Sequence, residues 1–174
     1  MRVRFPRLPD HERAYALVER DDGAVYRLYG GPASPRLPHE IVDFVVEREL
    51  RIGDGNWGAI AAGLVPDSQA GLRAALLADL VECVAGLDHP SDTQILTLAA
   101  TKLTAADAAV EPAEIAAAAQ ALQVEAARWA RLRVGEELSY DWPRAARAVQ
   151  ARRARVRKPR IVRSYRKREG RRPA

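Results

Sequence analysis

A nearly unbroken apolar run between residues 41 and 50 is the strongest constraint on how this chain can fold. On a helix it would cover most of the circumference, the pattern of a helix packed on more than one side. Pro38 has the fixed φ suited to a first helical position, and Glu40 adds a negative charge to the first turn. The sequence therefore predicts a central helix that begins near Pro38. Its apolar residues are Ile41, Val42, Phe44, Val45, Val46 and Leu50.

Polar side chains interrupt this run at regular spacing. His39, Asp43 and Glu47 are four residues apart, so they share one helix face, and Glu40 lies beside them. The segment from His39 to Asp43 resembles the His-Glu-x-x-His zinc motif with its second His replaced by Asp. One interpretation is a small, degenerate zinc-dependent hydrolase with Glu40 as general base and His39, Asp43 and Glu47 as metal ligands. The other is a solvated stripe on an otherwise buried helix.

The segment after the central helix is rich in glycine. Gly53, Gly55 and Gly58, together with Asn56, predict a tight loop with positive φ angles, in which Trp57 is a large anchor. A structural corner is the expected role.

Residues 1–36 have the pattern of antiparallel strands. Val3 and Phe5 alternate with arginines, which predicts a short first strand. Residues 14–18 and 24–29 are rich in aromatic and branched side chains and flank an Asp-Asp-Gly turn, which predicts a hairpin. Residues 30–38 contain two Gly and three Pro and predict a loop.

The apolar stripes and capping residues in most of the remaining chain predict helices. The first runs from about residue 67 to 85, with Leu72, Leu76, Leu80 and Cys83 on one side and the Cys83 thiol buried. A capping box at residues 91–94 opens the second, and Pro112 begins an alanine-rich third. Alternating residues 136–142 then predict a strand that returns to the N-terminal sheet.

The expected fold class is α+β, with a small antiparallel sheet of three to four strands packed against four to five helices. A compact domain would cover residues 1–143, and a basic helical or disordered tail would cover residues 144–174. A single Cys excludes an internal disulfide, and no apolar run is long enough to span a membrane. The expected location is the cytoplasm.

The run LPHEIVDFVVEREL, the GNWG corner and a late strand ending in Trp142-Pro143 together resemble a group of short uncharacterised proteins of high-GC Gram-positive bacteria. The resemblance covers roughly residues 1–143. It implies a bacterial protein with a compact domain, and it implies no activity.

Charge is divided sharply along the chain. Residues 152–172 hold 12 Lys or Arg and one Glu, a net charge of +11, while residues 1–150 carry a net charge of −6. Arginine pairs bidentately with phosphate, and clustered positive charge displaces counterions from a polyanion. The expected phosphate contacts are Arg152, Arg153, Arg155, Arg157, Lys158, Arg160, Arg163, Arg166, Lys167 and Arg168.

The leading functional hypothesis is therefore a non-enzymatic protein that binds RNA or DNA through this tail with little sequence preference. It needs no cofactor, whereas the hydrolase alternative needs zinc. The tail could instead be a solvated disordered segment, meet an acidic protein partner or the chain's own acidic body, or lie on an anionic membrane surface. A third hypothesis is a protein-interaction module that uses the alanine-rich helix. Composition leaves the oligomeric state open.

Overall fold

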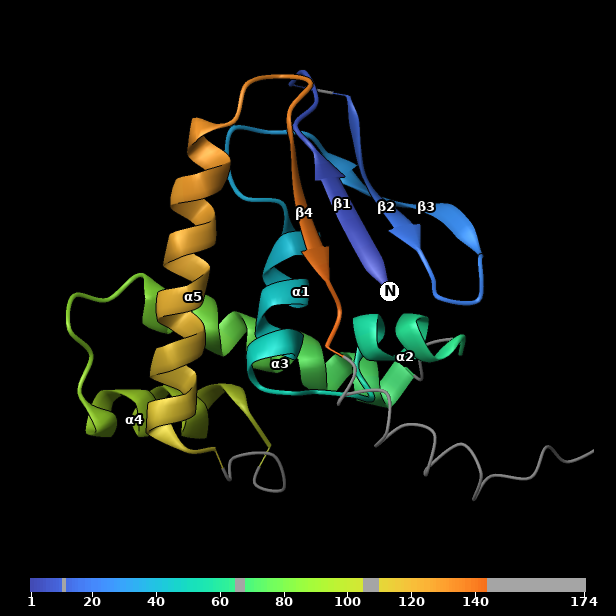
Figure 1. Ribbon diagram of the computed structural model, residues 1–174. Coiled ribbons are helices and arrows are strands. Elements are labelled where there is room, and N and C mark those ends of the chain that lie inside the picture. Colours follow the sequence, from blue (N-terminus) through green and yellow to red (C-terminus); the bar gives the residue numbers. More distant parts are fainter. Residues whose placement is uncertain (11, 65–67, 105–109, 144–174) are drawn as a thin grey trace, which may run out of the picture.

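The computed structural model describes residues 1–10, 12–64, 68–104 and 110–143, which form an α+β fold with a four-stranded antiparallel sheet and five helices (Figure 1). This confirms the predicted fold class. The elements are β1 (Arg2–Pro6), β2 (Arg13–Glu19), β3 (Val25–Pro32), α1 (His39–Glu49), α2 (Asn56–Ala62), α3 (Ser68–Ala85), α4 (Asp92–Lys102), α5 (Pro112–Arg131) and β4 (Glu137–Asp141).

The sheet joins the two ends of the described chain. Its strand order is β3-β2-β1-β4, so β1 lies between β2 and the late strand β4. Val3 pairs with Val18 on one side and with Tyr140 on the other. The predicted return of a late strand to the N-terminal sheet is confirmed. Gly23 closes the predicted hairpin with a φ of 86°.

The strand β3 is longer than expected. It continues through the Gly30-Gly31 pair to Pro32, which lies opposite Arg13, so the predicted loop over residues 30–38 was wrong in its first part. Edge strands tolerate Gly and Pro because one side of an edge strand needs no hydrogen-bonded partner.

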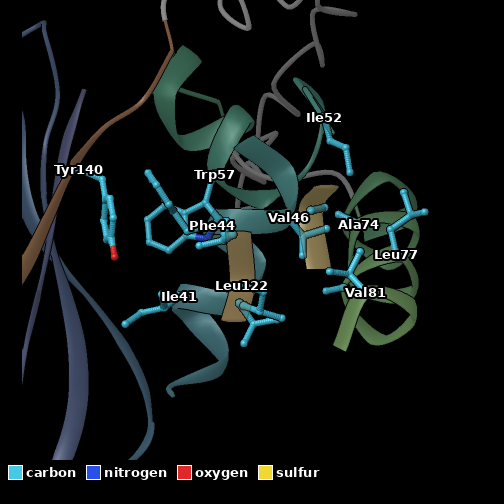
Figure 2. Packing of buried hydrophobic residues seen from close by; sticks show 14 of the residues in the cluster. Ile41, Phe44, Val46, Ile52, Trp57, Ala74, Leu77, Val81, Leu122 and Tyr140 are labelled. Atoms are coloured by element: carbon cyan, nitrogen blue, oxygen red, sulfur yellow. The ribbon is translucent and has the colours of Figure 1, made fainter. Parts of the chain in front are cut away.

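The helix α1 is central, as predicted, with Pro38 as its N-cap residue. It packs against both α3 and α5. Figure 2 shows Phe44 and Trp57 between Tyr140 of β4 and the side chains that α3 contributes, Ala74, Leu77 and Val81. The buried apolar residues of α1 are Ile41, Val42, Phe44, Val45 and Val46.

An aromatic cluster joins the sheet to the helices. The ring of Phe44 lies 5.3 Å from Trp57, 5.3 Å from Tyr140 and 5.4 Å from Trp142, measured between centroids. Phe5 of β1 meets Trp57 edge to face at 5.6 Å. Trp57 is the anchor that its size predicts, because it contacts residues from two other elements.

The glycine corner does not form the predicted loop of positive φ. Helix α2 begins at Asn56 with Gly55 as its N-cap residue, and of the residues between 51 and 58 only Arg51 has a positive φ, 54°. Oε2 of Glu47, on α1, accepts hydrogen bonds from the backbone nitrogens of Trp57 and Gly58 in the first turn of α2. This contact favours a second helix over a loop.

The buried face of α3 also differs from the prediction. Leu72 is 61% exposed and Cys83 is exposed, so the predicted burial of the thiol was wrong. The buried face keeps Leu80 of the predicted side and adds the small residues Ala74 and Ala78, which allow close approach of neighbouring helices. Its other buried residues are Leu77, Val81 and Val84.

The two later helices agree with their sequence signals. Ser91 and Gln94 form the predicted capping box at the start of α4. In α5, which begins at Pro112 as predicted, an apolar stripe is buried at Ile115, Ala119 and Leu122 and ends at Trp129. No helix within the described ranges combines the length and the apolar composition needed to cross a membrane.

Candidate nucleic-acid interface

The sheet has one face toward the helices and one face that no helix of the described residues covers (Figure 1). Val3, Phe5, Ala16 and Val18 point toward the helices and are buried, whereas the alternating residues of the same strands are exposed or half-buried. In Figure 1, α1 and α5 lie to the same side of the sheet. Among the described residues the second face is therefore open to solvent.

Positive charges on the β1 and β4 half of this open face are neutralised. Arg4 pairs with Glu19 at 2.5 Å and with Glu137 at 3.7 Å. These contacts, led by the hydrogen bond to Glu19, raise the pKa of the Arg4 guanidinium. Arg2 lies 3.7 Å from Asp141. Salt bridges of this kind neutralise surface charges, so this half of the open face offers little net positive charge to a polyanion.

The β2 and β3 half carries two stacked arginine–tyrosine pairs. The guanidinium carbon of Arg27 lies 4.8 Å from the ring centroid of Tyr15, and that of Arg13 lies 5.0 Å from the ring centroid of Tyr29. The two tyrosine rings meet edge to face at 6.2 Å. We call Arg13, Tyr15, Arg27 and Tyr29 the hairpin face.

The backbone register explains this arrangement. Tyr15 pairs directly with Tyr29 across the two strands. Each tyrosine follows an arginine at a spacing of two, so all four side chains point to the same face. Antiparallel pairing then places each arginine beside the tyrosine of the other strand. An irregularity in the ladder between Arg13 and Tyr15 adjusts the position of Arg13.

Neither arginine of the hairpin face has an acidic partner among the described residues. Arg13 donates a hydrogen bond to the carbonyl oxygen of Gly30 at 3.4 Å, and Arg27 has its stacking contact with Tyr15. The nearby carboxylate of Glu19 is held by Arg4. The hairpin face therefore presents two uncompensated cations beside two aromatic rings, in a body with net negative charge.

The polar residues of α1 form neither the predicted metal site nor a fully solvated stripe. Glu47 is only 1% exposed, and its Oε2 accepts hydrogen bonds from the backbone nitrogens of Trp57 at 2.9 Å and Gly58 at 3.2 Å. Burial raises the pKa of Glu47 to about 8, against the lowering effect of these amides. The carboxylate serves as the N-terminal acceptor of α2, so it does not belong to a solvated stripe.

His39, Glu40 and Asp43 do not form a shared site with Glu47. Nε2 of His39 lies 3.7 Å from Oδ1 of Asp43. Burial raises the pKa of Asp43, although the proximity of His39 lowers it. Glu40 lies against Gly30 of β3. In the part of the chain that the structure describes, no three His, Cys, Asp or Glu side chains are placed to hold a metal ion.

A second buried carboxylate, which was not predicted from the sequence, also has a structural role. Glu125 of α5 is 6% exposed and accepts a hydrogen bond from the hydroxyl of Tyr140 at 2.6 Å. Arg128 donates to both of its oxygens, at 3.0 Å and 2.9 Å. Burial, followed by the bond to Glu125, raises the pKa of the Tyr140 hydroxyl. These contacts fasten α5 to β4.

A shallow pocket lies where the end of α1 meets α3 and α5. Its volume is about 260 Å³, and its polar lining mixes both signs of charge. A lining of mixed sign favours no ligand of a single charge. The charged residues are Arg51, Asp54, Arg73, Glu111 and Glu114.

The ten predicted phosphate contacts between Arg152 and Arg168 lie outside the described residues. The hairpin face was not predicted as a site, although its tyrosines were assigned to the hairpin. A signal was present, since Arg13-Ala14-Tyr15 and Arg27-Leu28-Tyr29 repeat the same spacing on both sides of the turn. The register that brings the two repeats together emerges only from the paired strands.

Comparison of the chain with protein-family models, with curated proteins and with solved structures finds no match. The resemblance to short uncharacterised bacterial proteins therefore stays a prediction.

Proposed function

We propose that this protein binds nucleic acid without acting on it as an enzyme, and that the basic residues between 152 and 168 contact phosphates. The observation that carries the proposal is the hairpin face, where Arg13 and Arg27 have no carboxylate partner among the described residues. The net charge of +11 over residues 152–172 supports it independently. Two separate basic regions on an otherwise acidic chain favour a polyanionic partner.

Counterion release favours a polynucleotide over a carboxylate-bearing partner. All but two of the ten predicted contacts are arginine, whose planar guanidinium donates two parallel hydrogen bonds to a phosphate. Each phosphate that is neutralised releases condensed counterions, which makes the affinity strongly dependent on salt. An acidic protein lacks the condensed counterion layer of a polynucleotide.

The test is binding of labelled RNA and duplex DNA to three forms of the chain across a salt series. The forms are the full chain, a truncation that ends at Gln150, and a full-length variant in which the ten basic residues are Gln. We expect the full chain to bind with an affinity that falls steeply with salt, and both altered forms to bind weakly. Each phosphate contact contributes about 0.7 to 0.9 to the logarithmic salt slope. Absence of binding by the full chain at low salt would refute the proposal.

A further inference from the structure

We propose that the hairpin face is a stacking platform for the bases of single-stranded nucleic acid, with Tyr15 and Tyr29 each receiving one base. The inference rests on the proposed function and makes it specific, since it assigns the unpaired bases to the sheet and the phosphates to the basic residues.

Both tyrosine rings lie outside the core of the protein. Tyr29 is 52% exposed and Tyr15 is half-buried, on the sheet face that no described helix covers. Their ring contacts are with each other and with the two arginines, so neither ring belongs to the buried aromatic cluster. Exposed aromatic rings on an antiparallel sheet are the means by which several single-strand-binding folds hold unstacked bases.

The spacing of the two rings suits two separate bases. Their centroids are 6.2 Å apart and their planes differ by 62°, so a single flat base cannot stack on both rings at once. Two neighbouring bases of an unstacked strand can each meet one ring. In a duplex the bases are stacked within the helix and their faces are inaccessible, so this geometry selects single strands.

The two arginines beside the rings offer further contacts to the same strand. A guanidinium that lies over a tyrosine ring can also stack on a base or turn outward to a phosphate. Arg13 and Arg27 are free to do either, because no described carboxylate holds them. The ion pairs of Arg2 and Arg4 restrict the β1 half of the face, which places the predicted track of the strand along β2 and β3.

A peptide added to the exposed edge of β3 is the competing occupant of this region. Such a peptide would bind through backbone hydrogen bonds along the edge and would need neither the rings nor the cations of the sheet face. Stacked rings beside unpaired arginines match a polyanion whose units have flat faces, so charge and shape both favour nucleic acid.

The experiment measures binding of the full-length protein to three labelled probes: a single-stranded pyrimidine oligonucleotide of about ten nucleotides, an abasic strand of the same length and charge, and a duplex that contains the same strand. The test variant is the double substitution Tyr15→Ala and Tyr29→Ala. The double substitution to Phe keeps the rings, and Val25→Ala truncates another exposed side chain of β3, 63% exposed, without touching a ring. Thermal unfolding checks that each variant is folded.

We expect the alanine double variant to bind the single strand about 100-fold more weakly, which is about 1.4 kcal/mol for each tyrosine. Its affinity for the abasic strand and its salt slope should be unchanged. The phenylalanine double variant and Val25→Ala should bind all three probes like the unaltered chain.

Two results would overturn the inference in distinguishable ways. If the alanine double variant binds the single strand as tightly as the unaltered chain does, the platform is refuted while the salt-dependent phosphate binding stands. If the full chain binds none of the probes at low salt, the proposed function fails as well. Equal competition by polyglutamate, which has charge and no bases, would assign the face to an acidic protein and would also overturn the platform.

Discussion

Oε2 of Glu47 lies 2.9 Å from the backbone nitrogen of Trp57, so a carboxylate of α1 accepts a hydrogen bond from the first turn of α2. The same oxygen accepts from Gly58 at 3.2 Å, and the other oxygen of Glu47 has no hydrogen-bond partner among the described residues. The amides of a first helical turn need acceptors, and an oxygen of a carboxyl group can accept from them in either protonation state. Glu47 therefore fixes the position of α2 and, through it, of the buried Trp57.

The substitution Glu47→Ala should destabilise the fold strongly. It removes the acceptor of two buried amides and leaves a cavity, so we expect a loss of about 2 to 4 kcal/mol in the free energy of unfolding. Glu47→Gln keeps a carbonyl acceptor in the same place and should lose less than about 1 kcal/mol near pH 6. Urea unfolding followed by tryptophan fluorescence measures both.

The matched control for this prediction is Glu49→Ala, which removes an exposed carboxylate two residues away on the same helix. Glu49 pairs with Arg48 at the surface at 2.8 Å, so its loss should cost less than about 1 kcal/mol. Equal effects of the two alanine substitutions would show that Glu47 has no special role.

The stability of the protein should depend on pH through Glu47. Its pKa rises from 4.5, the ordinary value, to about 8 in the fold, so between these values the folded chain binds more protons than the unfolded chain. The free energy of unfolding must then fall as pH rises from about 5 to about 8. Burial raises the pKa of Asp43 as well, which acts in the same direction.

Denaturation curves between about pH 5 and pH 9 test this dependence. The variant Glu47→Gln cannot titrate at this position, so its stability should fall less over the same interval and should exceed that of the unaltered chain at the alkaline end. Parallel curves for the two proteins would contradict the assignment of the dependence to Glu47.

The absence of a side chain at Gly55 is required by the position of the Glu47 carboxylate. A Cβ built on Gly55 would overlap that carboxylate, although the φ of −71° would accept alanine. Because Glu47 is buried and held by α2, it cannot move aside. We expect Gly55→Ala to lose about 1 to 3 kcal/mol, measured by urea unfolding.

Gly30 provides a close control for the Gly55 substitution. A Cβ there would also overlap a carboxylate, that of Glu40, but Glu40 is half-buried at the start of α1 and can rotate toward solvent. Gly30→Ala should therefore change the free energy of unfolding by less than about 1 kcal/mol. A loss at Gly30 as large as that at Gly55 would contradict the argument from side-chain freedom.

The parts of the fold that could be predicted are those in which one periodic pattern dominates. Alternation defined β1 and β4, the Asp-Gly turn defined the hairpin, and Ser91 with Gln94 defined the start of α4. The glycine corner was misjudged because its structure depends on Glu47, ten residues earlier than Trp57, and no local pattern shows that contact.

The candidate site was harder to predict for a related reason. The spacing of His39, Asp43 and Glu47 correctly places them along α1, but helical spacing does not show which partner element each one meets. Glu47 faces α2 and Asp43 pairs with His39, so the three side chains of this helix face do not form one site. The hairpin face, in contrast, combines two local repeats whose register across β2 and β3 decides which rings and cations meet.

The hydrogen bond between Tyr140 and Glu125 should contribute measurably to stability, because both groups are buried. Tyr140→Phe leaves the ring in the aromatic cluster but removes the donor 2.6 Å from Oε2 of Glu125, whose remaining side-chain partner is Arg128. We expect a loss of about 1 to 2 kcal/mol, measured by urea unfolding at neutral pH. Tyr29→Phe, at a hydroxyl on the exposed hairpin face, should change the free energy by less than about 0.5 kcal/mol.

The sign of the Tyr140 pKa shift gives this prediction a second measurement. Burial and the bond to Glu125 raise the pKa above its ordinary value of 10.0, so the folded chain keeps the phenolic proton where the unfolded chain begins to lose it. The stabilisation is complete below about pH 10 and declines as the pH rises further. Unfolding curves of the unaltered chain and of Tyr140→Phe should therefore converge in strong alkali. A constant difference between them would mean that the cost of the substitution comes from packing and not from the proton that Tyr140 donates to Glu125.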